Sequence, residues 1–178
     1  QFSTQVLINN IQVSFIAFAG GILVCLGTVF ILVTNGAQVG MVAGAFHHVG
    51  EPGRFWGLIT PHGLLEISAI VIAGAAGLRL GWTIIDPGDR TRTRAVAEEA
   101  RTAVTIVLGL VAAFVVAGLI EGFVTPSDLP TAARVGTGVV VELAFVAYIL
   151  TFGPRQPASE LAVAPFSDHR EPVALMSR

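Results

Sequence analysis

The chain has 178 residues, of which 53% are apolar and 12% are charged, and its mean hydropathy is +0.77. This composition excludes an ordinary soluble domain and indicates an integral membrane protein surrounded by a lipid bilayer. The formal net charge is -2, and all ten basic residues are Arg, so no basic tract indicates a nucleic-acid partner.

Four segments are apolar over about 20 residues, the length needed to cross a hydrocarbon layer of about 30 Å. They are residues 11–34, 58–82, 103–124 and 132–153. Residues 35–49 are shorter and contain three glycines, so we predict a re-entrant or half-length helix there. The alternatives are an extension of the first span or a fifth span formed with residues 50–55. The predicted fold is all-α, a polytopic transmembrane helix bundle with four spanning helices plus one re-entrant or half-length helix.

The sequence divides into two regions. Residues 1–153 are predicted to form the transmembrane helical domain. Residues 154–178 are rich in Pro and polar residues, which is typical of an irregular extension. The first residue is Gln1 rather than Met, so the sequence leaves open where the native protein begins.

Charged residues predict which helix ends lie inside the cell. Arg is concentrated in the connection at residues 86–101 and in the tail, whereas the connections at 47–57 and 125–134 contain one Arg each. By the positive-inside rule, the Arg-rich connection and the tail are cytoplasmic. Because residues 35–49 are expected to return to their own side, we predict that the N- and C-termini are both cytoplasmic.

The stretch TPHGLLE at residues 60–66 places a histidine and a carboxylate one helical turn apart at the start of an apolar span. Pro61 is expected in the first turn of this helix, where its missing N–H costs nothing. At about 100° per residue, His62 and Glu66 share one stripe with small residues. These small residues are Ala69, Ala73, Gly77 and Gly81. Small residues at this spacing let helices pack closely in lipid, so the stripe and the polar pair are expected to face the bundle interior.

Carboxylates also occur beside small residues in the third and fourth spans. Gly109 and Glu121 lie in the third span, and Gly138 precedes Glu142 by one turn in the fourth. Three further glycines at four-residue spacing are predicted helix-packing positions: Gly36, Gly40 and Gly44. From the depths of the four polar residues below the outer surface, we expect them to converge on one chamber in the outer half of the membrane. They are His62, Glu66, Glu121 and Glu142.

Burying a carboxylate in the membrane costs at least about 2.5–3.5 kcal/mol unless it is protonated, paired or hydrated, so this cluster is a candidate functional site. His62 and Glu66 have two alternative interpretations: they form a structural hydrogen bond between helices, or they form a proton or ligand site. A metal site formed with His47 or His48 is a weaker alternative, because no HExxH motif is present. The single Cys25 excludes a multi-cysteine metal site. We therefore predict no metal, no cofactor and no catalytic residue.

Several of these stretches resemble the SpoIIM, or stage II sporulation protein M, family of bacterial membrane proteins. The resemblance extends over approximately residues 9–153. It is carried by NNIQVSFIAFAGGILVCLGT in the first span, by the glycine-rich segment at 35–44, and above all by PHGLLEISAIVIAGAAGLRLG at 61–81. It implies a multi-pass protein of the bacterial cytoplasmic membrane without established enzyme activity. The named member of the family works with peptidoglycan-degrading partners during engulfment of the forespore.

Three classes of function remain open from the sequence. The first is a non-enzymatic scaffold or assembly factor in a cell-envelope process, whose partners are other membrane or envelope proteins or further copies in a homo-oligomer. The second is a transporter or permease subunit that moves a proton-coupled solute or lipid through a chamber lined by intramembrane Glu. The third is an intramembrane hydrolase built around His62 and Glu66.

Overall fold

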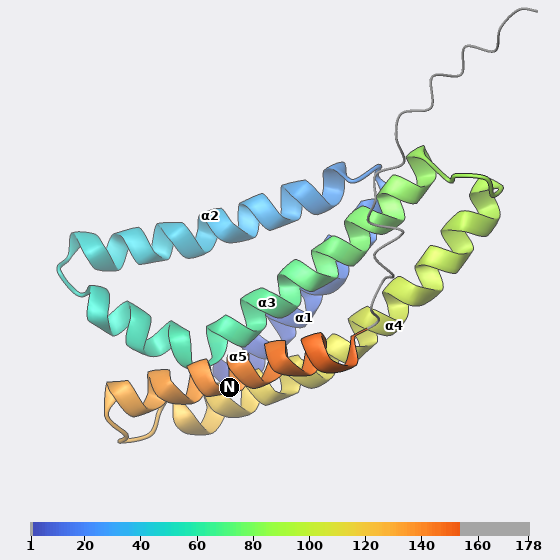
Figure 1. Cartoon of the computed structure of the whole chain (residues 1–178). Coiled ribbons are helices and arrows are strands. Elements are labelled where there is room, and N and C mark those ends of the chain that lie inside the picture. Colours follow the sequence, from blue (N-terminus) through green and yellow to red (C-terminus); the bar gives the residue numbers. More distant parts are fainter. Residues whose placement is uncertain (1, 154–178) are drawn as a thin grey trace, which may run out of the picture.

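The computed structural model describes residues 2–153, and every regular element in that range is helical (Figure 1). The elements are α1 (Phe2–Ala19), the 3-10 turn η1 (Gly20–Ile22), α2 (Leu26–His48), α3 (Pro52–Ile85), α4 (Arg92–Leu119), the π-helical η2 (Ile120–Val124) and α5 (Thr131–Phe152). Five helices in this range are long and apolar enough to cross a membrane. The all-α helical bundle predicted from the sequence is therefore confirmed, whereas the Pro-rich tail at 154–178 lies outside the described residues.

The central element is α3, which contacts each of the other four long helices (Figure 1). Its 34 residues exceed the roughly 20 needed to cross the hydrocarbon layer, so it projects beyond that layer or tilts within it. The apolar core lies between α3 and α4, with the buried side chains of Leu65, Ile70, Val107, Leu110 and Phe114. The small residues Ala69, Ala73 and Ala117 in the same cluster are fully buried, so they keep these two helices close together.

The first predicted span, residues 11–34, is wrong because the chain reverses direction inside it. Helix α1 ends at Ala19, and Val24 and Cys25 adopt left-handed backbone angles before α2 begins. The turn is possible because Gly20 and Gly27 meet without side chains: a Cβ added to Gly20 would lie 2.7 Å from the carbonyl carbon of Gly27. Just beyond the turn, the buried Thr28 hydroxyl donates a 2.6 Å hydrogen bond to the Ala17 carbonyl oxygen, which joins the two helices.

The predicted re-entrant helix at 35–49 is also wrong. These residues form the second half of α2, a continuous helix of 23 residues. Its glycines do not interrupt it, because in an apolar environment a helix satisfies every backbone polar group within the segment. Helix α2 then reaches a tight turn at Val49–Glu51 before α3 begins.

Pro61 lies inside α3 rather than at its start, which corrects the predicted helix boundary. Pro52 occupies the first turn instead, where a proline has no hydrogen bond to lose. Within the helix, Pro61 has no N–H to donate to the carbonyl of Gly57, so the helix has a weak point one residue before His62. Figure 1 shows α3 changing direction near this level.

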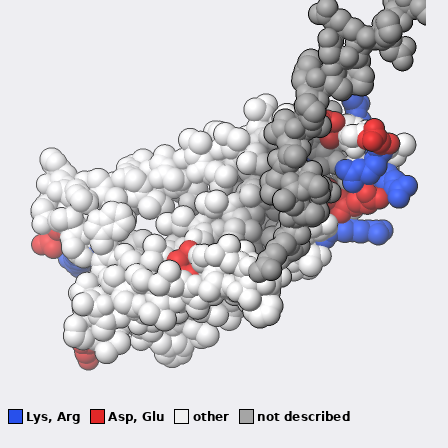
Figure 2. Space-filling model, in the orientation of Figure 1, with Lys and Arg blue, Asp and Glu red and all other residues white. Residues whose placement is uncertain are grey.

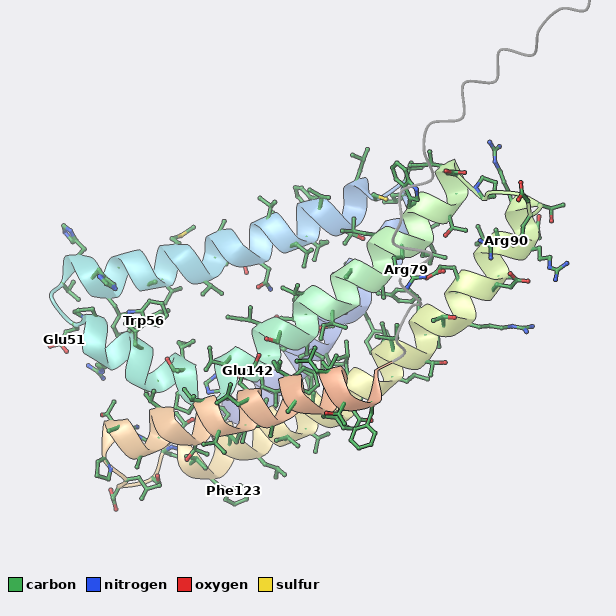
Figure 3. The ribbon with its side chains drawn as sticks, viewed as in Figure 1. Glu51, Trp56, Arg79, Arg90, Phe123 and Glu142 are labelled. Carbon is green, nitrogen blue, oxygen red and sulfur yellow. The ribbon has the colours of Figure 1, made fainter. Side chains whose placement is uncertain are left out.

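Charged side chains gather at the two ends of the helix bundle, and the middle of the face in Figure 2 is almost uncharged. The end where α3 meets α4 carries most of the Arg residues, with ion pairs between Arg79 and Glu99 and between Arg94 and Glu98. Figure 3 shows Arg79 and Arg90 at this end and Glu51 and Trp56 at the other. This distribution of charged side chains is typical of a helix bundle whose middle lies in hydrocarbon and whose ends lie in water.

Candidate functional site: a cavity with an acidic wall

A cavity of about 360 Å³ lies between α1, the second half of α2, the first half of α3 and the π-helical segment η2. Most of its wall is apolar, and its largest apolar side chains include Phe55, Leu58, Ile59 and Ile67 of α3. Its polar lining residues are Asn10, Asn35, Gln38, His62, Glu66, Glu121 and Thr125. Among the described residues no Arg lines the cavity, so two carboxylates face a space where His62 is the one basic side chain of that part of the chain.

Three ionisable side chains form the acidic wall, and each is only 5–6% exposed. Nδ1 of His62 lies 2.7 Å from Oε2 of Glu121, and Nε2 of the same ring lies 3.9 Å from Oε2 of Glu66. Neither His62 Nδ1 nor Glu121 Oε2 makes a hydrogen bond of good geometry within the described residues, and Glu66 Oε1 makes none. The arrangement therefore holds one close ion-pair contact and leaves one carboxylate oxygen of Glu66 available to a ligand or a proton.

Glu121 reaches this wall because the end of α4 winds into a π-helix. Residues 120–124 form η2, and the N–H of Thr125 donates a 2.9 Å hydrogen bond to the carbonyl oxygen of Ile120, five residues back. The wider turn changes the direction in which successive side chains point, so that both Glu121 and Thr125 line the cavity. Short π-helical segments occur often at functional sites, because they re-aim one side chain at the cost of a regular turn.

Three amide side chains in the lining were missed by the sequence analysis: Asn10 of α1 and Asn35 and Gln38 of α2. The available signal was their presence in otherwise apolar segments, where polar side chains tend to face protein or a cavity. The prediction of a re-entrant or half-length helix at residues 35–49 did not place Asn35 and Gln38 opposite α3. In the continuous α2 they lie opposite the polar face of α3.

Glu142 does not join the chamber, which corrects the prediction that all four polar residues converge. Its Oε1 accepts a 2.6 Å hydrogen bond from the Ser68 hydroxyl, at the contact between α5 and α3. Figure 3 shows Glu142 at the middle of α5, on the side toward α3. Since Ser68 follows Glu66 by two residues, the two side chains point in directions about 160° apart around α3. Glu142 is thus separated from the cavity by the body of α3.

The predicted packing glycines fall into two groups. A Cβ added to Gly77 would lie 2.7 Å from the Phe18 carbonyl oxygen, and one added to Gly138 would lie 2.7 Å from the Pro61 carbonyl oxygen. A Cβ added to Gly81 would likewise lie too close to atoms of Gly21 and Cys25. A Cβ built at the other four positions meets no neighbouring atom within 4 Å, so they make no close contact with another helix in residues 2–153: Gly36, Gly40, Gly44 and Gly109. Their faces point outward because the nearest helices pack against the other sides of α2 and α4.

The alternative of a metal site with His47 or His48 finds no support in this arrangement. His47 lies at the end of α2, where its Nε2 accepts a hydrogen bond of 3.3 Å from Trp56 Nε1, and neither His47 nor His48 lines the cavity. In the part of the chain that the structure describes, no group of three or more His, Cys, Asp or Glu side chains is arranged to hold a metal ion.

Comparison with known proteins places the chain in a family. The family model described as stage II sporulation protein M matches residues 1–126, a range that holds α1–α4, η2 and the whole cavity lining but ends before α5. An uncharacterised protein of Methanocaldococcus jannaschii is 32% identical over 127 residues, which cover 68% of this chain and 70% of that protein. No solved structure matches. The chain belongs to the stage II sporulation protein M family, and its long apolar helices agree with a membrane protein.

Proposed function

We propose that the chain is a permease subunit whose cavity receives a proton and a small solute within the membrane. The observation that carries this proposal is the set of three buried ionisable side chains on the wall of a cavity between apolar helices. Ionisable groups kept at such depth are costly and commonly form proton or substrate pathways. Glu66 Oε1 is buried beside the cavity and has no hydrogen-bond partner within the described residues, so it is available to a proton or a solute.

The proposed topology differs from the one expected from four spans. If all five long helices cross the membrane, residue 2 and residue 153 lie on opposite sides of it. The Arg-rich connection between α3 and α4 is assigned to the cytoplasm by the positive-inside rule. The start of α1 and the connection between α4 and α5 are then external, the end of α5 is cytoplasmic, and the cavity lies toward the outer surface of the cytoplasmic membrane.

Single cysteines test this topology in a Cys25→Ala background. Cysteines placed at Gln5 and Ser127 are expected to react with an impermeant thiol reagent applied from outside, and one at Thr93 only after permeabilisation. Labelling at Gln5 and at Thr93 from the same side would show that the chain crosses an even number of times between them. Mass spectrometry of the labelled protein gives the readout.

The permease proposal predicts that Glu66→Gln abolishes proton flux while the protein still folds. The amide keeps the shape and the hydrogen-bonding capacity of the side chain but neither titrates nor carries charge. In proteoliposomes with an internal pH dye, flux is expected to fall to the level of protein-free vesicles. Glu142→Gln is the matched control, because that carboxylate lies on the opposite side of α3 and should leave flux unchanged. Equal flux in wild type and Glu66→Gln would contradict a transport role for this site.

The second candidate function is a scaffold or assembly factor in a cell-envelope process. It is supported by the family's description as a sporulation protein and by α2, whose described residues include only Thr28 as a buried side chain. An apolar helix that is so little covered within the chain is suited to contact other membrane proteins or further copies of this chain. A defined partner that co-purifies with a flux-inactive chain would favour the scaffold over the permease.

A further inference from the structure

The wall of the cavity can be divided by charge into a paired part and an unpaired part. His62 Nδ1 and Glu121 Oε2 lie 2.7 Å apart and form the close pair on this wall, whereas the same imidazole ring lies 3.9 Å from Glu66. Glu66 is then the carboxylate without a compensating charge of its own. Because a buried isolated carboxylate is very unfavourable, Glu66 must carry a proton or a bound cation.

The other groups that face Glu66 do not supply that cation. From α3 comes the imidazole of His62, from η2 the carboxylate of Glu121, from α1 the amide of Asn10, and from α2 the amides of Asn35 and Gln38. Helix α5 contributes no lining residue. The lining thus offers acceptors and neutral amides around one carboxylate, and its remaining surface is mainly aliphatic and aromatic.

We infer that the cavity binds an organic monocation with an apolar body, which takes the place of the proton on Glu66. This inference rests on the proposed permease function and names the class of its solute. An ammonium group would pair with Glu66 and donate further hydrogen bonds to the amide oxygens, while its apolar body would contact Phe55, Ile59 and Val42. An anion would bring like charge against two carboxylates, and a sugar would leave its hydroxyls facing an apolar wall.

The exchange is balanced in charge and in atoms. A protonated amine enters the cavity, the Glu66 carboxylic acid releases its proton to water, and the ammonium and carboxylate form an ion pair. No covalent bond to carbon forms or breaks. One proton therefore leaves for each cation bound, which couples the movement of the cation to that of a proton in the opposite direction. A cavity of about 360 Å³ lies near the lower end of the volumes found for small-molecule sites, so the solute is small.

The test uses the full chain in lipid nanodiscs and a set of adamantane compounds of one shape and different charge. Calorimetric titration compares 1-adamantanamine with the neutral 1-adamantanol and the anionic 1-adamantanecarboxylate, each corrected for empty nanodiscs. The amine is expected to bind saturably, and the alcohol and the acid roughly tenfold more weakly or not at all, because a charge-assisted pair is lost. Titration in buffers of different ionisation enthalpy should show about one proton released for each amine bound, since one carboxylic acid ionises.

Two variants test whether the amine binds at Glu66. Glu66→Gln should reduce amine binding and remove the proton release, whereas Glu142→Gln should change neither, because it lies across α3 from the cavity. Equal binding of the amine and the alcohol to the wild-type chain would overturn the inference without any variant, as would unchanged binding and proton release in Glu66→Gln. If no adamantane compound binds but proton flux still depends on Glu66, the cation inference fails and the permease proposal stands. If both flux and binding are absent, both fail.

Discussion

Gly77→Leu is expected to prevent formation of the folded protein, whereas Gly109→Leu should leave it intact. A Cβ at Gly77 would lie 2.7 Å from the carbonyl oxygen of Phe18 and 2.8 Å from that of Ala17. Both obstacles are backbone atoms of α1, which cannot rotate away as a flexible side chain could. Overpacking of this kind costs typically about 1–3 kcal/mol and more when the backbone must move. The helices α1, α2 and α3 meet at this point, so their separation would disrupt the whole bundle.

Gly109 is the matched control because the substitution and the secondary structure are the same. A Cβ built there meets no atom within 4 Å, so a leucine would extend outward from α4. The two variants, purified in the same detergent, are compared by size-exclusion chromatography and by the midpoint of thermal unfolding. Equal loss of folded protein in both would contradict the assignment of Gly77 to a close helix contact and of Gly109 to the outer surface.

The contrast between these glycines explains how far the fold could be predicted from the sequence. The length and hydropathy of the segments were enough to predict a helical membrane bundle, because hydrocarbon favours helices regardless of sequence detail. A glycine in an apolar segment, however, can have either of two structural roles. Gly77 permits a close contact, whereas Gly20 and Gly27 permit a reversal of the chain. Distinguishing them requires knowledge of the neighbouring helix, so one span was predicted where the structure has a helical hairpin.

The candidate site shows the same division between local and tertiary information. The spacing of His62 and Glu66 predicts their common face, because both belong to one helix. The contact of His62 with Glu121 depends on the π-helical turn of η2, which no local pattern indicated. The separation of Glu142 was missed for a related reason: its depth in the membrane could be calculated, but the side of α3 that it faces could not. Depth alone therefore does not place two carboxylates in one chamber.

Glu121→Leu is expected to destabilise the folded protein by about 3–5 kcal/mol, the range found when one partner of a buried ion pair is removed. The reason is that His62 would remain buried beside an apolar side chain, with its Nδ1 deprived of the oxygen now 2.7 Å away. The change should appear as a large drop in the midpoint of thermal unfolding, followed by the fluorescence of Trp56 and Trp82. The predicted loss exceeds that for Glu142→Leu, which would leave only the Ser68 hydroxyl without its partner, at about 1–3 kcal/mol.

The double variant His62→Leu/Glu121→Leu tests whether His62 and Glu121 stabilise the folded protein as a pair or independently. Replacing both members of a buried ion pair by apolar groups is often neutral or stabilising, so the double variant should recover much of the stability that Glu121→Leu loses. It removes both members of the pair and leaves Glu66 as the one ionisable side chain among the described residues that line the cavity. The single variant His62→Leu is measured as well. If the stability losses of His62→Leu and Glu121→Leu simply add in the double variant, His62 and Glu121 do not act as a pair. The charge balance that leaves Glu66 as the exchangeable acid would then be wrong as well.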